Sequence, residues 1–209
     1  MKYIVTQNGY VLFDVISALQ KEIRRANEEA AMYWALELVP KFEAYLWRRL
    51  IIIANEDIGI ANIPILTLVP SQRAVYLEMR GEGKDSSARL ILANTILAMC
   101  RGPKSRIADH FQCAVHQDRL HGKRLEIPDY ALDKHTSRGR KLGRDVQHWL
   151  DVGCQLVPPS EVPDPYVARA AHNWQTDFIE VSWGRRSSKG APADFETEDL
   201  PASTPSLFD

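Results

Sequence analysis

The segment 46–62, LWRRLIIIANEDIGIAN, constrains the fold of this 209-residue chain more than any other stretch. Its four consecutive residues Leu50–Ile53 are too apolar for a surface helix, and a helix that is apolar all round is buried. Two acids, Glu56 and Asp57, follow at once, and buried acids need partners. Gly59 then offers the conformation in which helices end. The segment therefore predicts a buried helix that closes in a charged turn.

Helical periodicity also fills the chain on either side of this segment. One face of a first helix is marked by apolar residues at i, i+3, i+4, i+7 and i+11, namely Leu12, Val15, Ile16, Leu19 and Ile23. Further helices are expected at about residues 28–39, 43–55, 72–79, 86–100 and 104–120, with a short helical or irregular piece at 142–150. Pro64 and Pro70 are expected to bracket a short connection. Because strand-like alternation is confined to residues 2–6 and 178–183, the predicted fold class is all-α, a helical bundle.

The chain is expected to consist of three parts. Residues 1–150 form the helical domain. Residues 151–189 form an irregular extension that packs on it, because prolines at 158, 159, 163 and 165 interrupt helices. Residues 190–209 hold five acids, no Lys or Arg and few apolar groups, which predicts a disordered acidic tail. Since the formal charge of the whole chain is only -1, the rest is mildly basic, and the tail could dock on it or repel other polyanions.

Cysteine and histidine usage argues against a metal or redox framework. Cys100, Cys113 and Cys154 are widely spaced and odd in number, which fits neither a disulfide framework nor a zinc-ligand pattern. Among the six histidines, only His110 and His116 could share a helical face with Cys113, and ordinary packing explains that grouping better. No metal and no other cofactor is therefore expected.

The N-terminal residues and the length of the apolar runs indicate where in the cell the protein is expected. The first residues lack the pattern of a signal peptide, and no apolar run approaches the roughly 18–20 residues that a membrane span needs. These features, together with the scattered cysteines, predict a cytoplasmic protein without membrane contact.

The opening segment and four further blocks carry a resemblance to a known family. The four blocks are FDVISALQKEIR at 13–24, AAMYWALEL at 30–38, ARLILANTILAMCRGPKS at 88–105, and the stretch from IPDY at 127 to KLG at 143. In this order they resemble the C-terminal region of the RarA/MgsA/WRNIP-type AAA+ ATPases, which are relatives of the clamp loader. His135, Gly139, Lys141 and Gly143 fall at positions of the family pattern, whereas Arg106 replaces its usual Asn.

The resemblance implies a helical bundle, similar to the collar of the clamp loader, that forms a homotetramer and performs no catalysis. The phosphate-binding loop GxxxxGK[ST] does not occur in these 209 residues, so we do not expect them to hydrolyse ATP. The expected function is that of a non-catalytic accessory protein in DNA replication, recombination or repair, which homo-oligomerises and binds DNA. An adaptor or regulator of a separate AAA+ ATPase is the alternative.

The charges around the apolar helix allow two interpretations. Arg48, Arg49, Glu56 and Asp57 are interpreted as a structural charge network, because adjacent acids on a helix point apart. The other interpretation is a metal-dependent DNA-modifying hydrolase that uses the two acids with nearby histidines. It predicts a metal-dependent activity that Glu56→Ala abolishes without unfolding the protein.

A basic stretch is the best candidate for contact with DNA. Five cations, Lys134, Arg138, Arg140, Lys141 and Arg144, lie within eleven residues. Two glycines between them allow the backbone to approach a phosphate. Such contacts are independent of sequence and sensitive to salt. Residues 185, 186 and 189 are also basic and could extend this surface.

The last residues resemble a peptide that binds the bacterial sliding clamp. Peptides of the type Q-L-[SD]-L-F occupy a hydrophobic cleft of the clamp, and Ser206, Leu207 and Phe208 match the last three positions. Thr204 and Pro205 depart from the pattern. An exposed Leu-Phe pair on a flexible acidic tether suits a pocket on a partner, so these three residues are expected to bind the clamp.

Overall fold

The computed structural model describes residues 3–39 and 41–176, and it contains α-helices joined by turns. No strand is assigned within these residues, so the all-α fold class is confirmed. The chain divides into two compact units, Met1–Arg124 and Leu125–Asp209. This division lies about 25 residues before the boundary expected at residue 150, because the short elements from residue 129 onward contact one another.

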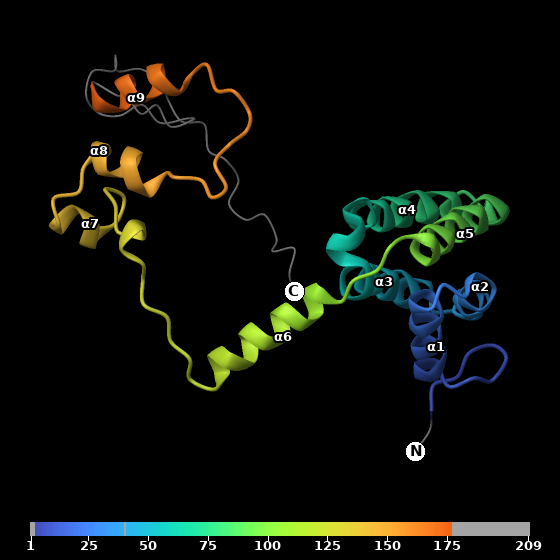
Figure 1. The fold of residues 1–209 in the computed structure, drawn as a ribbon. Helices are drawn as coiled ribbons and strands as arrows, with labels where there is room; N and C mark the ends of the chain where they lie inside the picture. Colours follow the sequence, from blue (N-terminus) through green and yellow to red (C-terminus); the bar gives the residue numbers. More distant parts are fainter. Residues whose placement is uncertain (1–2, 40, 177–209) are drawn as a thin grey trace, which may run out of the picture. The chain divides into compact units, whose positions relative to one another are not determined.

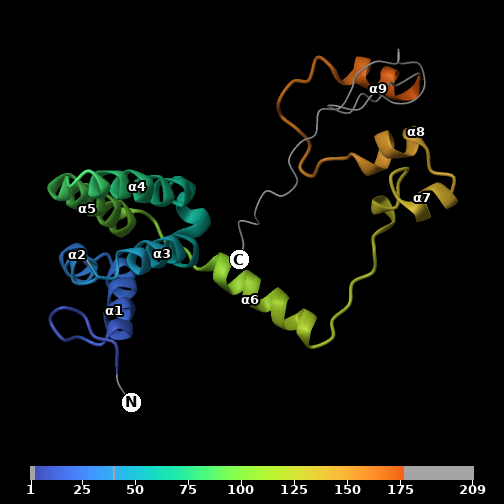
Figure 2. The same cartoon turned by 180° about the vertical axis from the view of Figure 1, so that it is seen from behind.

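The first unit is a bundle of helices (Figures 1 and 2). The helices are α1 (Leu12–Arg24), α2 (Glu28–Glu37), α3 (Glu43–Ile53), α4 (Ile63–Gly81), α5 (Asp85–Arg101) and α6 (Ile107–Leu120). Helices α4 and α5 lie side by side, as do α1 and α2, and α3 contacts both α1 and α4. Helix α6 extends away from the other five in both views.

Helix α3 supplies the centre of the hydrophobic core, as its composition predicts. Leu46, Trp47, Leu50 and Ile53 are fully buried, and the Trp47 ring packs 5.1 Å from that of Tyr76, measured between ring centroids. Apolar side chains from α1, α2, α4 and α5 complete this core. The helix and the burial of this face are therefore confirmed, whereas Ile52, from the same apolar run, is 45% exposed.

The helical path continues beyond the end of α3. A five-residue π-helical turn, Ala54–Ile58, and a 3-10 turn, Gly59–Asn62, carry it directly into α4. The short connection expected between Pro64 and Pro70 is therefore wrong. Pro64 lies in the first turn of α4, where no backbone N–H is needed, and Pro70 lies inside the helix.

The continuous helical stretch Glu43–Gly81 is long and apolar enough, by length and composition, to cross a membrane. The core helix of a bundle has the same composition. Within this stretch Leu46, Leu50, Ile53, Ile58 and Val69 are buried among the other helices of the unit. Packing inside the chain thus accounts for part of the apolar character of the segment, since 39% of its apolar 18-residue window is buried.

The predicted strand at 2–6 is reduced, in the part of it that the structure describes, to a single bridge between Val5 and Val11. A loop between these residues is closed by a hydrogen bond from the Thr6 N–H to the Tyr10 carbonyl, at 2.9 Å. The second predicted strand, at 178–183, lies outside the described residues.

The second unit is built from short pieces. They are a 3-10 turn (Asp129–Ala131), α7 (Ser137–Lys141), α8 (Val146–His148), a π-helical turn (Trp149–Gly153) and α9 (Val167–Gln175). Of its described residues, only Leu132 and Gly139 are buried, so this unit has almost no buried core. The piece expected at 142–150 corresponds to α8 and the turn after it. Helix α9 adds regular structure to the stretch that we expected to be irregular.

Candidate functional site

Asp57 lies at the centre of a buried charge cluster in the first unit. Its side chain is fully enclosed and accepts a hydrogen bond from Gln20 Nε2 at 2.9 Å. Arg24 of the same helix, α1, donates from Nε at 2.8 Å and from Nη2 at 3.2 Å. The Asp57 carbonyl accepts the N–H of Ser105 at 3.0 Å. Side chain and backbone of one residue therefore join the π-helical turn to α1 and to the segment that precedes α6.

Glu56 and Arg106 extend this cluster to the start of α6. Nη2 of Arg24 and Nη2 of Arg106 each lie 3.4 Å from Glu56 Oε1. The Arg106 guanidinium also lies 3.6 Å from Asp57 and 2.5 Å from Asp109. The residue that departs from the family pattern thus forms ion pairs with three acids. Glu56 itself is 26% exposed, so its charge is partly solvated.

The predicted charge network overlaps with this cluster in part. Glu56 and Asp57 are in it, and Arg49 reaches it through a hydrogen bond to the side chain of Gln20. Arg48 does not, because its Nε donates to the Ala44 carbonyl of its own helix at 3.2 Å. Sequence reasoning missed the cations of the cluster, Arg24 and Arg106, although a buried acid does signal that such partners exist.

The metal-dependent interpretation requires ligands beside these acids. Within residues 3–39 and 41–176, no group of three or more His, Cys, Asp or Glu side chains is arranged to hold a metal ion. The oxygen atoms of Asp57 instead accept hydrogen bonds from Gln20 and Arg24.

The buried cysteine of the first unit, Cys100, carries a protonated thiol near neutral pH, because burial raises the pKa of that thiol to about 11.

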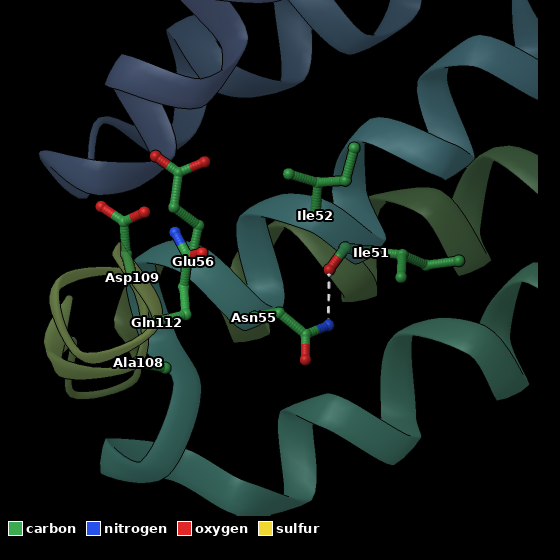
Figure 3. Close-up of a pocket in the computed structure, with 7 residues that line it drawn as sticks. All are labelled: Ile51, Ile52, Asn55, Glu56, Ala108, Asp109 and Gln112. Atoms are coloured by element: carbon green, nitrogen blue, oxygen red, sulfur yellow. Dashed lines mark hydrogen bonds between the residues drawn. The ribbon is translucent and has the colours of Figure 1, made fainter. Parts of the chain in front are cut away.

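A groove of about 590 Å³ lies beside the cluster, between α3 with its π-helical turn and the first turns of α6 (Figure 3). It is lined by Ile51, Ile52, Asn55, Glu56, Ala108, Asp109 and Gln112. The two isoleucines give it an apolar wall, and Ile52 is 45% exposed although its helix is the core of the unit. The Asn55 amide is fixed by a hydrogen bond to the Ile51 carbonyl at 2.9 Å.

Helix α6 beside the groove carries an apolar stripe. None of its 14 residues is buried. Ile107, Phe111 and Val115 recur every fourth position on one face and are 56%, 69% and 53% exposed. An isolated helix of this length is only marginally stable in water. A stripe of this kind is typical of a helix that packs against a partner.

In the second unit, Arg144 differs from the other predicted DNA-binding cations. Its side chain is only 17% exposed, and Nη1 donates to the carbonyls of Asp129 and Leu132, both at 2.7 Å. Its hydrogen bond to the Asp129 carboxylate holds the pKa of that group below its usual value. Arg144 therefore ties the segment that follows α7 back to the 3-10 turn that precedes it, and its guanidinium already has protein partners.

Gly139 is required by the packing of α7. A Cβ atom at this position would lie 1.8 Å from the carbonyl oxygen of Asp133. The Gly139 N–H bonds to Thr136 Oγ1 at 2.9 Å, which caps the helix. The Asp133 carboxylate accepts the backbone N–H of His135 at 2.9 Å and lies 3.0 Å from its ring nitrogen Nδ1, and these contacts lower the pKa of Asp133.

The remaining four cations of the basic stretch lie closer to solvent. Arg138 and Lys141 on α7 are exposed, and the structure gives neither side chain an ion pair within the described residues. Arg140 is also exposed, although its Nη1 donates to the carbonyls of Lys134 and His135. Lys134 is half-buried. The predicted cations at 185, 186 and 189 and the predicted clamp-binding residues Ser206, Leu207 and Phe208 lie outside the described residues.

Comparison with known proteins decides the family. The family described as "MgsA AAA+ ATPase C terminal" matches residues 26–165, which run from before α2 to beyond the basic stretch. This chain belongs to that family. The resemblance inferred from the five sequence blocks is thereby confirmed.

Several of the relatives carry a name from replication and recombination. Replication-associated recombination protein A of Bacillus subtilis is 30% identical over 168 residues, which are 76% of this chain and 38% of the relative. An uncharacterised AAA domain-containing protein of Mycobacterium tuberculosis is 29% identical over 76% of this chain and 36% of its own length. The ATPase WRNIP1 of Dictyostelium discoideum is 28% identical over 52% of this chain and 12% of its own length. The chain therefore spans less than two fifths of these relatives.

Proposed function

We propose that this chain is a non-catalytic accessory protein of DNA replication or recombination that assembles with copies of itself and contacts DNA. Membership of the family and the name of the Bacillus subtilis relative support a role in replication or recombination. The observation that carries the self-assembly is α6, a 14-residue helix with an apolar stripe and no buried residue. The Asp57 cluster has a structural role in this proposal, because it fixes the start of α6.

The partner of α6 is a second copy of this chain. The apolar stripe of α6 and the apolar wall of the groove lie on the same unit. The stripe of each copy can therefore pack against the groove of the other copy, which makes the same contact twice. Phe111 of one copy would then cover Ile51 and Ile52 of the other. A fully buried Phe or Ile side chain contributes about 1.5–3 kcal/mol, which is enough for a few such side chains to dominate an interface. The family resemblance supports a tetramer, formed by two such pairs.

Phe111→Glu is expected to break the assembly, because a carboxylate in an apolar contact loses its hydration without gaining a partner. Light scattering should give an oligomer for the unaltered chain and the mass of one chain, 23.7 kDa, for this variant. Phe13→Glu is the matched control, since Phe13 is a 62% exposed phenylalanine on α1. An unaltered chain that is monomeric, or a Phe111→Glu variant of full oligomeric mass, would contradict the proposal.

DNA contact is assigned to the exposed cations of the basic stretch. Arg138 and Lys141 carry most of this contact, with Lys134 and Arg140 beside them, whereas Arg144 serves the fold. Because such cations neutralise phosphates and release counterions, binding should weaken steeply with salt.

The variant with Arg138→Ser and Lys141→Ser is expected to bind forked DNA about tenfold more weakly at low salt, with a salt slope smaller by about 2. Fluorescence anisotropy of a labelled fork at several salt concentrations measures both quantities. Arg73→Ser with Arg89→Ser removes the same charge from exposed positions of the first unit and is the matched control. If the two double variants lose affinity equally, net charge and not the basic stretch governs binding.

Two further roles remain proposals of the same kind. Since full-length relatives contain the region that this chain matches, mixed assembly with a separate AAA+ ATPase would use the same α6 contact. The proposed clamp contact of Ser206, Leu207 and Phe208 is independent of it. Co-purification of a tagged ATPase relative with the unaltered chain but not with Phe111→Glu would favour the adaptor role.

A further inference from the structure

The second unit holds an aromatic cluster next to the basic stretch. Trp149 is its hub, with the Trp174 ring 4.9 Å away at 76° and the His135 ring 5.6 Å away at 82°, between centroids. Lys134 Nζ lies over the Trp149 ring, 4.9 Å from its centroid. Trp149 comes from the π-helical turn and Trp174 from α9, so segments from three parts of the sequence meet at this ring.

One edge of the Trp149 ring lies close to the backbone of Gly153. A Cβ atom at Gly153 would lie 2.9 Å from Trp149 Cδ1, so only glycine permits this approach. The side chain of Lys134, by contrast, is a flexible cation that can leave the ring without disturbing the turn. The cluster therefore combines a closely packed aromatic ring with a flexible cation above it.

A second ring of the same kind lies at the start of α9. The Arg169 guanidinium lies over the Tyr166 ring, 5.5 Å from its centroid, and Tyr166 is 63% exposed. The unit thus presents two aromatic rings that each carry a cation, in addition to the exposed cations Arg138 and Lys141.

A ring with a cation above it matches one nucleotide of a single strand. The face of the unpaired base stacks on the ring, and the phosphate attracts the cation that the base displaces. Duplex DNA offers its phosphates but not its base faces, because those are already stacked on neighbouring bases. Aromatic residues interleaved with cations are accordingly typical of surfaces that bind single strands.

We infer that the second unit binds single-stranded DNA by stacking bases on Trp149 and Tyr166, with Lys134 and Arg169 drawn to the phosphates. This inference rests on the proposed contact with DNA and names the form of DNA that the basic stretch receives.

The test compares oligo(dT) of about 20 nucleotides with a duplex of the same length, by anisotropy at low salt. Tyr166→Ser and Trp149→Leu are each expected to weaken oligo(dT) binding roughly fivefold or more, the effect of losing one stacked base. Duplex binding should change less than twofold. Tyr3→Ser is the matched control, because Tyr3 is a 66% exposed tyrosine of the first unit.

The outcomes separate this inference from the proposed function. Equal losses on single strand and duplex, or no loss on oligo(dT), would overturn the stacking site while leaving DNA contact in place. Failure of the unaltered chain to bind any DNA would overturn both. Tighter binding of oligo(U) than of oligo(dT) would move the site to RNA and contradict the DNA assignment. Circular dichroism checks whether Trp149→Leu is folded. If Trp149→Leu unfolds, the test rests on Tyr166→Ser, which changes an exposed position.

Discussion

Asp57→Ala is expected to lower the free energy of unfolding of the first unit by about 3 kcal/mol, the lower end of the range for breaking a buried ion pair. The Asp57 side chain is fully enclosed, and its removal leaves Gln20 Nε2 without its acceptor and Arg24 with only the longer contact to Glu56. The two cations that face it, Arg24 and Arg106, are 31% and 40% exposed, so water can partly replace the lost carboxylate. Urea unfolding followed by circular dichroism measures the change.

Glu56→Ala is the matched control for this change. The two acids are adjacent and share Arg24 and Arg106, but Glu56 is 26% exposed and its contacts are 3.4 Å long. A partly solvated pair of this kind contributes about 1 kcal/mol or less. If Glu56→Ala destabilises the unit as much as Asp57→Ala does, burial is not what makes Asp57 important.

Gly139→Ala is expected to disrupt the second unit, since the added methyl would overlap the backbone of Asp133. The predicted contact of 1.8 Å joins the added Cβ atom, whose position the backbone fixes, to the carbonyl oxygen of Asp133, so no side-chain rotation can relieve it. Overpacking of this severity costs about 3 kcal/mol or more, which raises the population of the opened unit roughly 100-fold. Limited trypsin digestion measures it, because Arg138 and Lys141 become cleavable when α7 opens.

Gly81→Ala provides the comparison for that glycine. Gly81 ends α4, and nothing lies within 4 Å of a Cβ atom built there. Alanine is the better helix former, so stability should be unchanged or rise by about 1 kcal/mol. Unaltered protease resistance in Gly139→Ala would show that α7 does not need to approach Asp133 so closely.

The sequence predicts the helices well and their connections less well. The periodicity of α1 predicts its buried face correctly. The apolar run of α3 predicts burial of Leu50 and Ile53 correctly, but Ile52 is 45% exposed. Pro64 and Pro70 misled the prediction because proline was taken to end a helix. The effect of a proline on a helix depends on where in the helix it lies, and neither Pro64 nor Pro70 ends α4.

Site residues were predicted by type and not by partner. Charge density identified the stretch 134–144, but it could not show that Arg144 is occupied by carbonyls from residues 12 and 15 positions earlier. Likewise, Gly139 was interpreted as room for a phosphate, whereas the backbone of Asp133 takes that room. Such contacts depend on the path of the loops between these residues, and no local sequence pattern predicts that path.

The π-helical turn Ala54–Ile58 has a consequence for how this cluster can arise and be lost. A π-helical turn holds one residue more than an α-helical turn, and each residue of a helix rotates the chain by about 100°. The direction of Asp57 toward Arg24, and the approach of Ser105 to its carbonyl, therefore depend on the number of residues in the turn as well as on their chemistry. Where those partners are present, a single-codon insertion in an ordinary helix can supply the extra residue of the turn. A single-codon deletion turns the acid away from its cations while leaving every side chain of the cluster in the sequence.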